Sequence, residues 1–250
     1  MLTFYRRLRR KILSENKFSK YLIYALGEIV LVVIGILIAL QINNWNQTRK
    51  LKQEETKVLH GLMVEFSENL AKFDAHYKNQ IRRDEIIKAL LDPNTVHAPF
   101  ETIDSLIYYH GWNYKFNPST GIYNSVINSG KIDLISNDSL KKAISKFNNY
   151  LVDFAEEEEG ANNYGTNFMT PYMRSQLNYR FPFRNRTKEQ LDYDNKYYRE
   201  VIKQDKTRNE LIFYSSYLLI TLKEGQELRR QIFMIMNMLD DQLKNNSAQQ

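Results

Sequence analysis

The sequence predicts an all-α protein in which a single N-terminal transmembrane helix continues into a long helix of an extramembrane antiparallel helical bundle. Three observations predict this fold. One apolar run of about 20 residues lies near the N-terminus. The rest of the chain repeats its apolar residues at helical spacing, and glycine and proline are scarce, at nine and five of 250 residues. No stretch alternates apolar and polar residues for long enough to predict a sheet.

The apolar run is YLIYALGEIVLVVIGILIAL, 21–40, and Glu28 is its one charged residue. A helix of this length crosses the roughly 30 Å hydrocarbon core of a bilayer. A cleaved signal peptide is the alternative, but its apolar core is about 7–15 residues long and precedes a small-x-small cleavage site. The sequence ALQINNWN that follows offers no such site. We therefore expect a retained transmembrane helix over 21–42.

The first twenty residues predict the orientation of this helix. They hold seven of the 35 basic residues and one of the 29 acidic residues, so the other 230 residues carry 28 of each. The positive-inside rule then places a basic tail, 1–20, in the cytoplasm and the remainder outside. Because membrane lipid accounts for the excess positive charge, lipid is an expected partner and nucleic acid is not.

Beyond the membrane, 43–245 is predicted to form one helical bundle. Its first helix leaves the membrane and runs to residue 91, because apolar residues keep helical spacing and Asp92-Pro93 ends the pattern. A short helix over 102–110 follows, and then the irregular aromatic segment YYHGWNYKFNPSTG, 108–121.

The middle of the bundle is predicted from its caps. Ser119 is the expected N-cap of a helix that ends at residue 128 and is closed by Gly130. A tight connection, KIDLI, leads to a helix capped by Asn137 or Asp138 and running to about residue 169. Pro171 then kinks that helix or starts another.

The last predicted helix spans 206–243 and is long enough to pair antiparallel with the first. Before it, RFPFRNRT, 180–187, is expected to be a solvated loop, although Arg180, Arg184 and Arg186 could meet phosphate or lipid headgroups. Residues 246–250 are expected to be a disordered tail.

Two blocks carry a family resemblance. LSENKFSKYLIYALGEIVLVVIGILIALQINNWN, 13–46, resembles the near-fixed membrane span of a family of uncharacterised single-pass membrane proteins abundant in Bacteroidota. YNSVINSGKIDLISNDSL, 123–140, resembles a second, weaker block of that family. The resemblance implies the inner membrane of a two-membrane cell, and hence a periplasmic bundle, but it implies no activity.

A stripe of small and polar residues marks one face of the expected span. At 100° per residue, Gly35, Ala39 and Asn46 fall within about 20° of Glu28. Small residues let helix backbones approach, and a polar group in such a contact finds a partner in place of lipid. The stripe therefore predicts transmembrane association with a second copy or with another membrane protein. The alternative is a neutral Glu28 that reaches toward the interface and has no role.

The aromatic segment is the best candidate for a recognition surface. Tyr109, Trp112, Tyr114 and Phe116 could wall a site, since aromatic rings with polar tips suit sugars and amphipathic ligands. The alternative is that these rings cap the bundle and are buried in it. We expect burial, in which case Trp112→Ala would cost about 3–5 kcal/mol.

No pattern in the sequence indicates catalysis, a metal site or a cofactor. The chain has no cysteine, and none of its four histidines pairs with a second ligand at metalloenzyme spacing. The run AEEEEG, 155–160, fans its carboxylates around a helix in steps of about 100°. It is therefore expected to be a solvated face, or else a docking patch for a basic partner.

These observations favour an interaction or scaffold protein that is not an enzyme. Two other functions stay open: a periplasmic ligand-sensing module that uses the aromatic segment, and an accessory subunit of an ion-coupled membrane complex that uses Glu28. A partner list from purification in mild detergent would separate the three.

Overall fold

The computed structural model describes the backbone of residues 17–177 and 186–248, and within these ranges all regular structure is helical. The predicted all-α class is therefore confirmed. The chain divides into two compact units, Met1–Glu54 and Glu55–Gln250. They are called the first and the second unit below.

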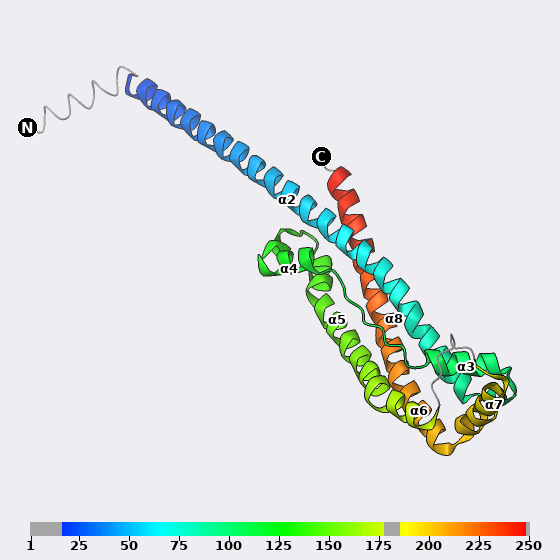
Figure 1. Cartoon of the computed structure of the whole chain (residues 1–250). Helices are drawn as coiled ribbons and strands as arrows, with labels where there is room; N and C mark the ends of the chain where they lie inside the picture. Colours follow the sequence, from blue (N-terminus) through cyan, green and yellow to red (C-terminus); the bar gives the residue numbers. More distant parts are fainter. Residues whose placement is uncertain (1–16, 178–185, 249–250) are drawn as a thin grey trace, which may run out of the picture. The chain divides into compact units, whose positions relative to one another are not determined.

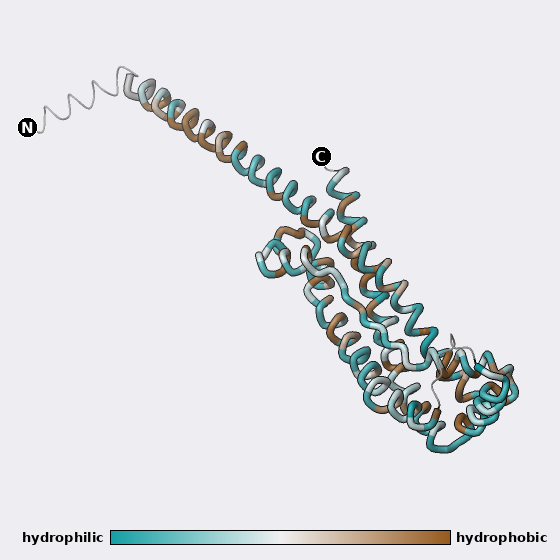
Figure 2. Tube along the Cα trace, viewed as in Figure 1, coloured by the Kyte–Doolittle hydropathy of each residue, from teal (hydrophilic) through white to brown (hydrophobic). Residues whose placement is uncertain are grey.

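The described part of the first unit belongs to one helix. This helix, α2, spans Lys17–Leu91 without interruption, so the predicted continuation of the apolar run into a long helix is confirmed (Figure 1). It is the one helix in residues 17–177 and 186–248 that is long and apolar enough to cross a membrane. Every side chain described from residue 21 to residue 51 is exposed; hydrophobic residues predominate in 21–40 and hydrophilic residues in 41–51 (Figure 2).

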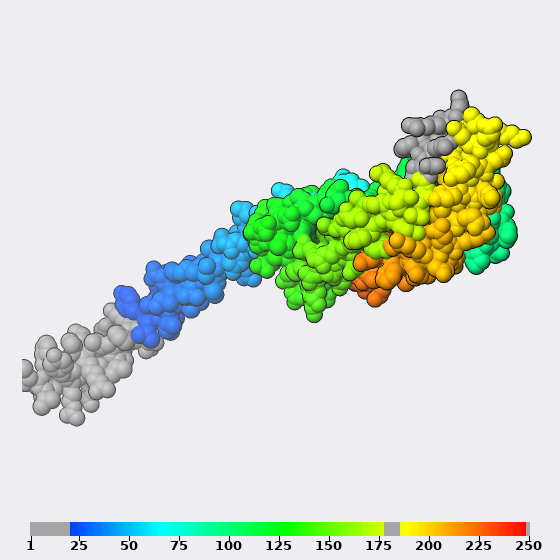
Figure 3. All heavy atoms as spheres, turned by 60° about the horizontal axis from the view of Figure 1, so that its bottom comes forward, coloured from blue at the N-terminus to red at the C-terminus, as the bar shows by residue number. Residues whose placement is uncertain are grey.

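Three long helices form the second unit's main core: the part of α2 from Glu55 onward, α5 (Asp138–Tyr164) and α8 (Asp205–Ala248). The shorter elements are η1 (Pro93–His97), α3 (Phe100–Tyr109), α4 (Gly121–Asn128), η2 (Lys131–Leu134), the π-turn η3 (Gly165–Met169), α6 (Thr170–Gln176) and α7 (Lys188–Lys203). Figure 3 shows one face of this unit, where α5 lies against α4 and α8.

Pairings fix the direction of α8 relative to α2. The Asp74 carboxylate accepts two hydrogen bonds from Arg229, at 2.6 and 3.1 Å, and the Tyr77 hydroxyl donates to the Leu222 carbonyl at 2.8 Å. Positions rise along α2 as their partners fall along α8, so the two helices are antiparallel. The predicted antiparallel pairing of the first and last helices is confirmed.

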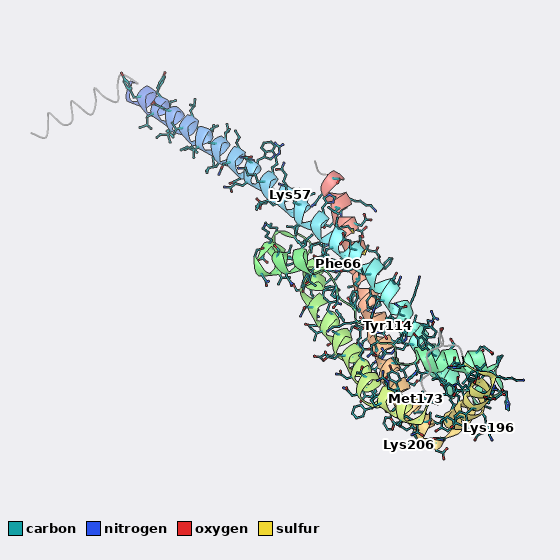
Figure 4. The ribbon with its side chains drawn as sticks, in the orientation of Figure 1. Lys57, Phe66, Tyr114, Met173, Lys196 and Lys206 are labelled. Atoms are coloured by element: carbon teal, nitrogen blue, oxygen red, sulfur yellow. The ribbon has the colours of Figure 1, made fainter. Side chains whose placement is uncertain are left out.

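The third long helix, α5, runs parallel to α2. The Phe66 and Phe147 rings pack with centroids 4.7 Å apart, and Phe73 packs on Phe154 at 5.2 Å. These rings belong to a buried cluster that continues along α8 through Leu228, Ile232 and Leu239. Figure 4 labels Phe66 on the part of α2 that builds this core.

A second buried cluster lies at the other end of the second unit, where α3, α6 and α7 meet α2 and α8. Ile103 and Ile107 from α3 join Tyr198 and Val201 from α7, together with Leu211 from α8. The sequence analysis did not predict α7. Its start carries a capping box in which Thr187 accepts from the Gln190 amide and Gln190 accepts in return from the Thr187 amide.

The last helix is longer than predicted. It begins at Asp205 and continues to Ala248, so the expected disordered tail is wrong for 246–248, while residues 249 and 250 lie outside the described residues. Asn246 is buried, and its side chain is satisfied there: its amide donates to the Glu55 carboxylate at 3.2 Å, and the side chain of Gln242 donates to its carbonyl oxygen at 3.3 Å.

The turns around α4 confirm three expectations and correct one. Gly130 has a φ of 72°, the left-handed conformation that favours glycine. The segment after it forms the tight turn η2, and the Asn137 side chain caps α5 by accepting from the Leu140 amide at 3.1 Å. Ser119, however, is not the N-cap of α4. Thr120 takes that position without a capping side-chain bond of its own.

The parallel arrangement of α2 and α5 requires the chain to travel back along the bundle between them. Residues 111–120 do this as irregular, largely extended chain, called the return segment below (Figure 1). An extended chain outside a sheet has no neighbouring strand for its N–H and C=O groups, so side chains must supply their partners. These side chains make up much of the candidate site.

Candidate functional site

The four residues of the predicted association stripe all lie on the exposed stretch of α2. Glu28, Gly35, Ala39 and Asn46 are exposed, and a Cβ atom added at Gly35 would meet nothing within 4 Å. They lie on one helix face, as the helical period requires. The side of the helix that carries them is therefore open for close approach by another helix.

The aromatic segment is divided between surface and core. Phe116 is buried, with its ring centroid 4.9 Å from that of Phe73, so it belongs to the core and not to a recognition surface. Tyr109 and Tyr114 are half-buried. Trp112 is 45% exposed, which contradicts its expected burial. The indole lies outside because the chain leaves α3 two residues earlier and turns into the return segment.

Three neighbouring rings form an aromatic cluster at the start of the return segment. The Trp112 ring packs edge-on against Tyr108 and Tyr109, with centroids 5.9 and 5.0 Å away. The guanidinium carbon of Arg82 lies 5.3 Å from the centroid of the Tyr109 ring, within reach of a cation–π interaction. The cluster is therefore anchored to α2 and leaves the indole accessible.

Polar side chains of α2 hold the far end of the return segment. The Asn69 side chain accepts from the Ser119 amide at 2.8 Å and donates to the Ser119 carbonyl at 2.7 Å. Glu65 accepts from the amides of Ile122 and Tyr123, at 2.7 and 2.8 Å. Glu65 thus satisfies free N–H groups at the start of α4, which explains how Thr120 can be the N-cap residue although its side chain makes no capping hydrogen bond.

One residue of the acidic run is buried, which corrects the expectation of a solvated face. The Glu158 carboxylate accepts from the Phe116 amide and from the Gln80 side chain, each at 2.8 Å, and it contacts the His76 ring. Glu156 and Glu159 are exposed, as expected. The reading failed at Glu158 because its partners come from two segments distant in the sequence.

Arg83 is the most unusual buried group in the second unit. Its side chain is 1% exposed, and its guanidinium donates to the Tyr214 hydroxyl at 2.8 Å and to the Asn162 side chain at 2.8 Å. Longer bonds reach side-chain oxygens of Gln80 and Asn113, at 3.3 and 3.2 Å. All these acceptors are neutral, and no carboxylate pairs with Arg83 in the described parts of the chain.

The charge of Arg83 also acts on its neighbours. Burial lowers the pKa of His110 to about 4, an effect that the hydrogen bond to the Ile107 carbonyl opposes and the positive charge of Arg83 reinforces. Burial raises the pKa of the Tyr214 hydroxyl, while Arg83 opposes that rise. His110 is therefore neutral at pH 7 and contributes no second charge.

A small pocket opens between α2 and the aromatic cluster, with a cavity volume of about 30 Å³. Asn79, Arg82, Arg83 and Ile86 line one wall, and Tyr109, Trp112 and Tyr114 line the other. Figure 4 labels Tyr114 beside this part of α2. The volume holds one or two water molecules, so a whole sugar ring does not fit inside it.

Other charged groups from the sequence analysis serve the fold. Arg186 lies before α7 in irregular chain, as predicted, but its side chain is not solvated: it pairs with Asp104 at 2.9 Å, whereas Arg180 and Arg184 lie outside the described residues. His60 and His97 are exposed. Within residues 17–177 and 186–248, no three His, Cys, Asp or Glu side chains come together as metal ligands.

Comparison with known proteins gives one match. Residues 28–157 match the model of a family described as a "Family of unknown function (DUF6090)". The match begins inside the apolar stretch and ends in α5, so it includes the return segment together with Glu65 and Asn69, while Glu158 and Asn162 lie just beyond it. No curated protein and no solved structure matches the chain. Because the matched region exceeds half of the 250 residues, the chain belongs to this family of unknown function.

Proposed function

We propose that this protein is a single-pass anchor of the inner (cytoplasmic) membrane whose periplasmic helical bundle acts as an interaction scaffold without catalytic activity. The observation that carries the proposal is the stripe of Glu28, Gly35, Ala39 and Asn46 on a stretch of α2 that is exposed all round and is otherwise apolar from residue 21 to residue 40. Because lipid does not drive helices together, transmembrane contacts form where small residues allow close approach and polar groups find partners.

The use of buried charge in the second unit supports a scaffold. Glu65 and Glu158 accept hydrogen bonds from main-chain amides, and Glu55 accepts from the Ser136 amide at 2.7 Å. These carboxylates stabilise turns and the return segment. A general acid or base, by contrast, must have a proton-accepting atom within reach of substrate.

Self-association can be tested with a cysteine reporter, because the chain has no cysteine of its own. Ile42→Cys introduces a thiol close to the stripe, about 40° from Glu28 around the helix. We expect oxidation of this variant in membranes to give a disulfide-linked dimer if the partner is a second copy. If the partner is a different membrane protein, that protein should co-purify in mild detergent.

Two matched glycine variants show whether the stripe is the contact. Gly35→Leu should reduce association, whereas Gly27→Leu makes the same substitution about 100° away around the helix and should leave association unchanged. A Cβ atom at either glycine meets nothing within 4 Å in the described parts of the chain, so we expect neither change to disturb the fold. The proposal fails if no dimer and no partner is found, or if both variants behave alike.

Orientation is tested by fusing a reporter that is active only outside the cytoplasm to the C-terminus. We expect activity, and we expect it to fall when Arg6, Arg7, Arg9 and Arg10 are replaced by neutral residues, because these charges retain the N-terminus in the cytoplasm. Activity of a cytoplasm-only reporter at the same position would contradict the proposed topology.

A second candidate function, a ligand-sensing module, is favoured by the exposed Trp112 beside the pocket on α2. The association variants and the ligand titration measure different properties, so one function can fail without the other.

A further inference from the structure

We propose that the pocket lined by Arg82, Arg83 and Trp112 binds the carboxylate of an acidic ligand whose remaining atoms lie against the exposed indole. The inference is independent of association through the membrane helix. If it holds, it gives the ligand-sensing function its chemistry.

Arg83 carries a buried positive charge that no carboxylate of the described chain pairs with. Burying a guanidinium costs several kcal/mol unless an opposite charge compensates it. Arg83 is buried among neutral acceptors, and the carboxylate of Glu158 is reached only through the side chain of Gln80, which donates to Glu158 and accepts from Arg83. An anion in the pocket would supply the missing negative charge.

Arg82 supplies the donors that Arg83 lacks. The guanidinium of Arg83 has five N–H groups, and these are occupied by Tyr214, Gln80, Asn162, Asn113 and the Ala161 carbonyl. Arg82 is exposed and makes no hydrogen bond or ion pair within the described chain, and its one recorded contact is with the Tyr109 ring. Its planar fork matches a carboxylate in a bidentate pair.

Both walls of the pocket are held in place by the fold. Asn79, Arg82, Arg83 and Ile86 are spaced i, i+3, i+4 and i+7, so they lie on one face of α2. The opposite wall is held by two bonds. The Asn162 side chain donates to the Tyr114 carbonyl at 2.7 Å, and the Asn113 side chain donates to the Thr166 hydroxyl at 2.6 Å.

The size of the cavity selects the group that enters. A cavity of about 30 Å³ has room for one or two water molecules, so a carboxylate can enter it and a whole ring cannot. The remainder of the ligand must lie outside, where Trp112 offers its exposed indole and Tyr109 its ring edge. A small organic acid and an acidic peptide share this chemistry.

Trp112 provides the readout. The chain has two tryptophans, so Trp45→Phe leaves Trp112 as the single one in the full-length protein. This protein, in detergent micelles, is titrated with sodium acetate and with the peptide Ala-Glu, using sodium chloride to keep ionic strength constant. We expect a saturable change in fluorescence with at least one of the two, and none with acetamide or Ala-Gln bearing a blocked C-terminus.

Charge variants then locate the site. Arg82→Gln should weaken binding at least tenfold. Arg82→Lys should weaken it at least threefold, because lysine keeps the positive charge but lacks the planar guanidinium that pairs with both carboxylate oxygens. Lys78→Gln is the matched control: it removes a positive charge from an exposed position of α2 that does not line the pocket, and it should change affinity less than twofold.

The results with the two probes distinguish the two classes of acidic ligand. Saturation by both probes supports a small-acid site, and saturation by the peptide alone supports an acidic-peptide site. The proposal is overturned if neither probe saturates, if the neutral probes act equally, or if Lys78→Gln weakens binding as much as Arg82→Gln. Gly35→Leu should leave the titration unchanged, so a failure of membrane association does not imitate a failure of this site.

Discussion

The same helix, α2, places similar residues in two different environments. In the first unit Leu37 is 57% exposed and Glu28 has no partner recorded within the described chain, whereas in the second unit Leu59 is 0% exposed and Glu65 bonds two main-chain amides. The first unit leaves its apolar side chains and its carboxylate to surroundings outside the chain. The second supplies both packing and hydrogen bonds from within. Residue type alone therefore does not tell which side chains stabilise the fold.

The largest expected effect is a difference in stability between variants of Phe116 and Trp112, two aromatic residues of the return segment. Phe116→Ala should lower the free energy of unfolding by about 3–5 kcal/mol, because it empties a site between Phe73 and Phe154. Trp112→Ala should cost less than about 1 kcal/mol, because the indole is largely outside the core. Urea unfolding of the full chain in detergent, followed by circular dichroism, measures both.

Equal losses in the two variants would contradict this division between core and surface. A loss of several kcal/mol from Trp112→Ala alone would show that the aromatic cluster stabilises the bundle as strongly as its core. That result would remove the basis for treating the indole as a recognition surface.

Two glycines sharpen the comparison between the units. A Cβ atom at Gly225 would come within 2.6 Å of the Tyr77 ring and 3.1 Å of Phe154, while one at Gly35 would meet nothing. The Tyr77 ring cannot easily move, since its hydroxyl is bonded to the Leu222 carbonyl. Gly225→Leu should therefore cost about 3 kcal/mol through overpacking, and Gly35→Leu should leave unfolding of the second unit unchanged. A stable Gly225→Leu protein would show that α2 and α8 can separate without loss.

Local signals in the sequence predicted much of the fold. Asp92-Pro93 marked the end of α2, Gly130 the turn after α4, and Asn137 the start of α5, because each acts within a few residues of itself. The helix α7 was not predicted although Thr187 and Gln190 have the residue types of a capping box, because the sequence analysis assigned no structure between the loop at 180–187 and the helix at 206–243.

The candidate site was less predictable because its contacts are distant in sequence. Glu158 looked like its acidic neighbours, and only the fold brings it to the Phe116 amide, 42 residues away. Arg83 carried no signal at all, since its acceptors come from α5, α8 and the return segment. Tyr109, Trp112 and Tyr114 were identified from composition, but which of them would be exposed depended on where the chain leaves α3.

A pH titration tests the interior of the second unit. The pKa of His110 falls from 6.5 to about 4 in the folded state, so between these values the unfolded chain binds a proton that the folded chain does not. The stabilising effect is fully present above pH 6.5 and is lost as the pH falls toward 4, by about 3 kcal/mol. Unfolding measured at pH 7, 5.5 and 4.5 should show this loss.

Two histidine variants isolate that contribution. His110→Gln should flatten the dependence between pH 6.5 and 4, whereas His60→Gln, at an exposed position of α2, should leave it as in the unmodified chain. Parallel curves for all three proteins would show that the loss of stability on acidification comes from other groups.

The smallest expected effect concerns Glu28, the one carboxylate of the span. If it meets a polar partner between helices, Glu28→Gln should preserve association and Glu28→Leu should weaken it by about 0.6–2 kcal/mol, the range for polar contacts in membranes. An accessory role in an ion-coupled complex gives a different order. There Glu28→Gln should abolish function while the assembly stays intact, and Glu28→Asp should retain some function, because only a titrating group can carry a proton. The crosslinking yield of Ile42→Cys, measured together with a growth phenotype in each of the three Glu28 variants, distinguishes the packing role from the ion-coupled role. If all three variants match the unmodified chain, then the carboxylate needs no partner, and the contrast between Glu28 and the bonded carboxylates of the second unit has no functional meaning.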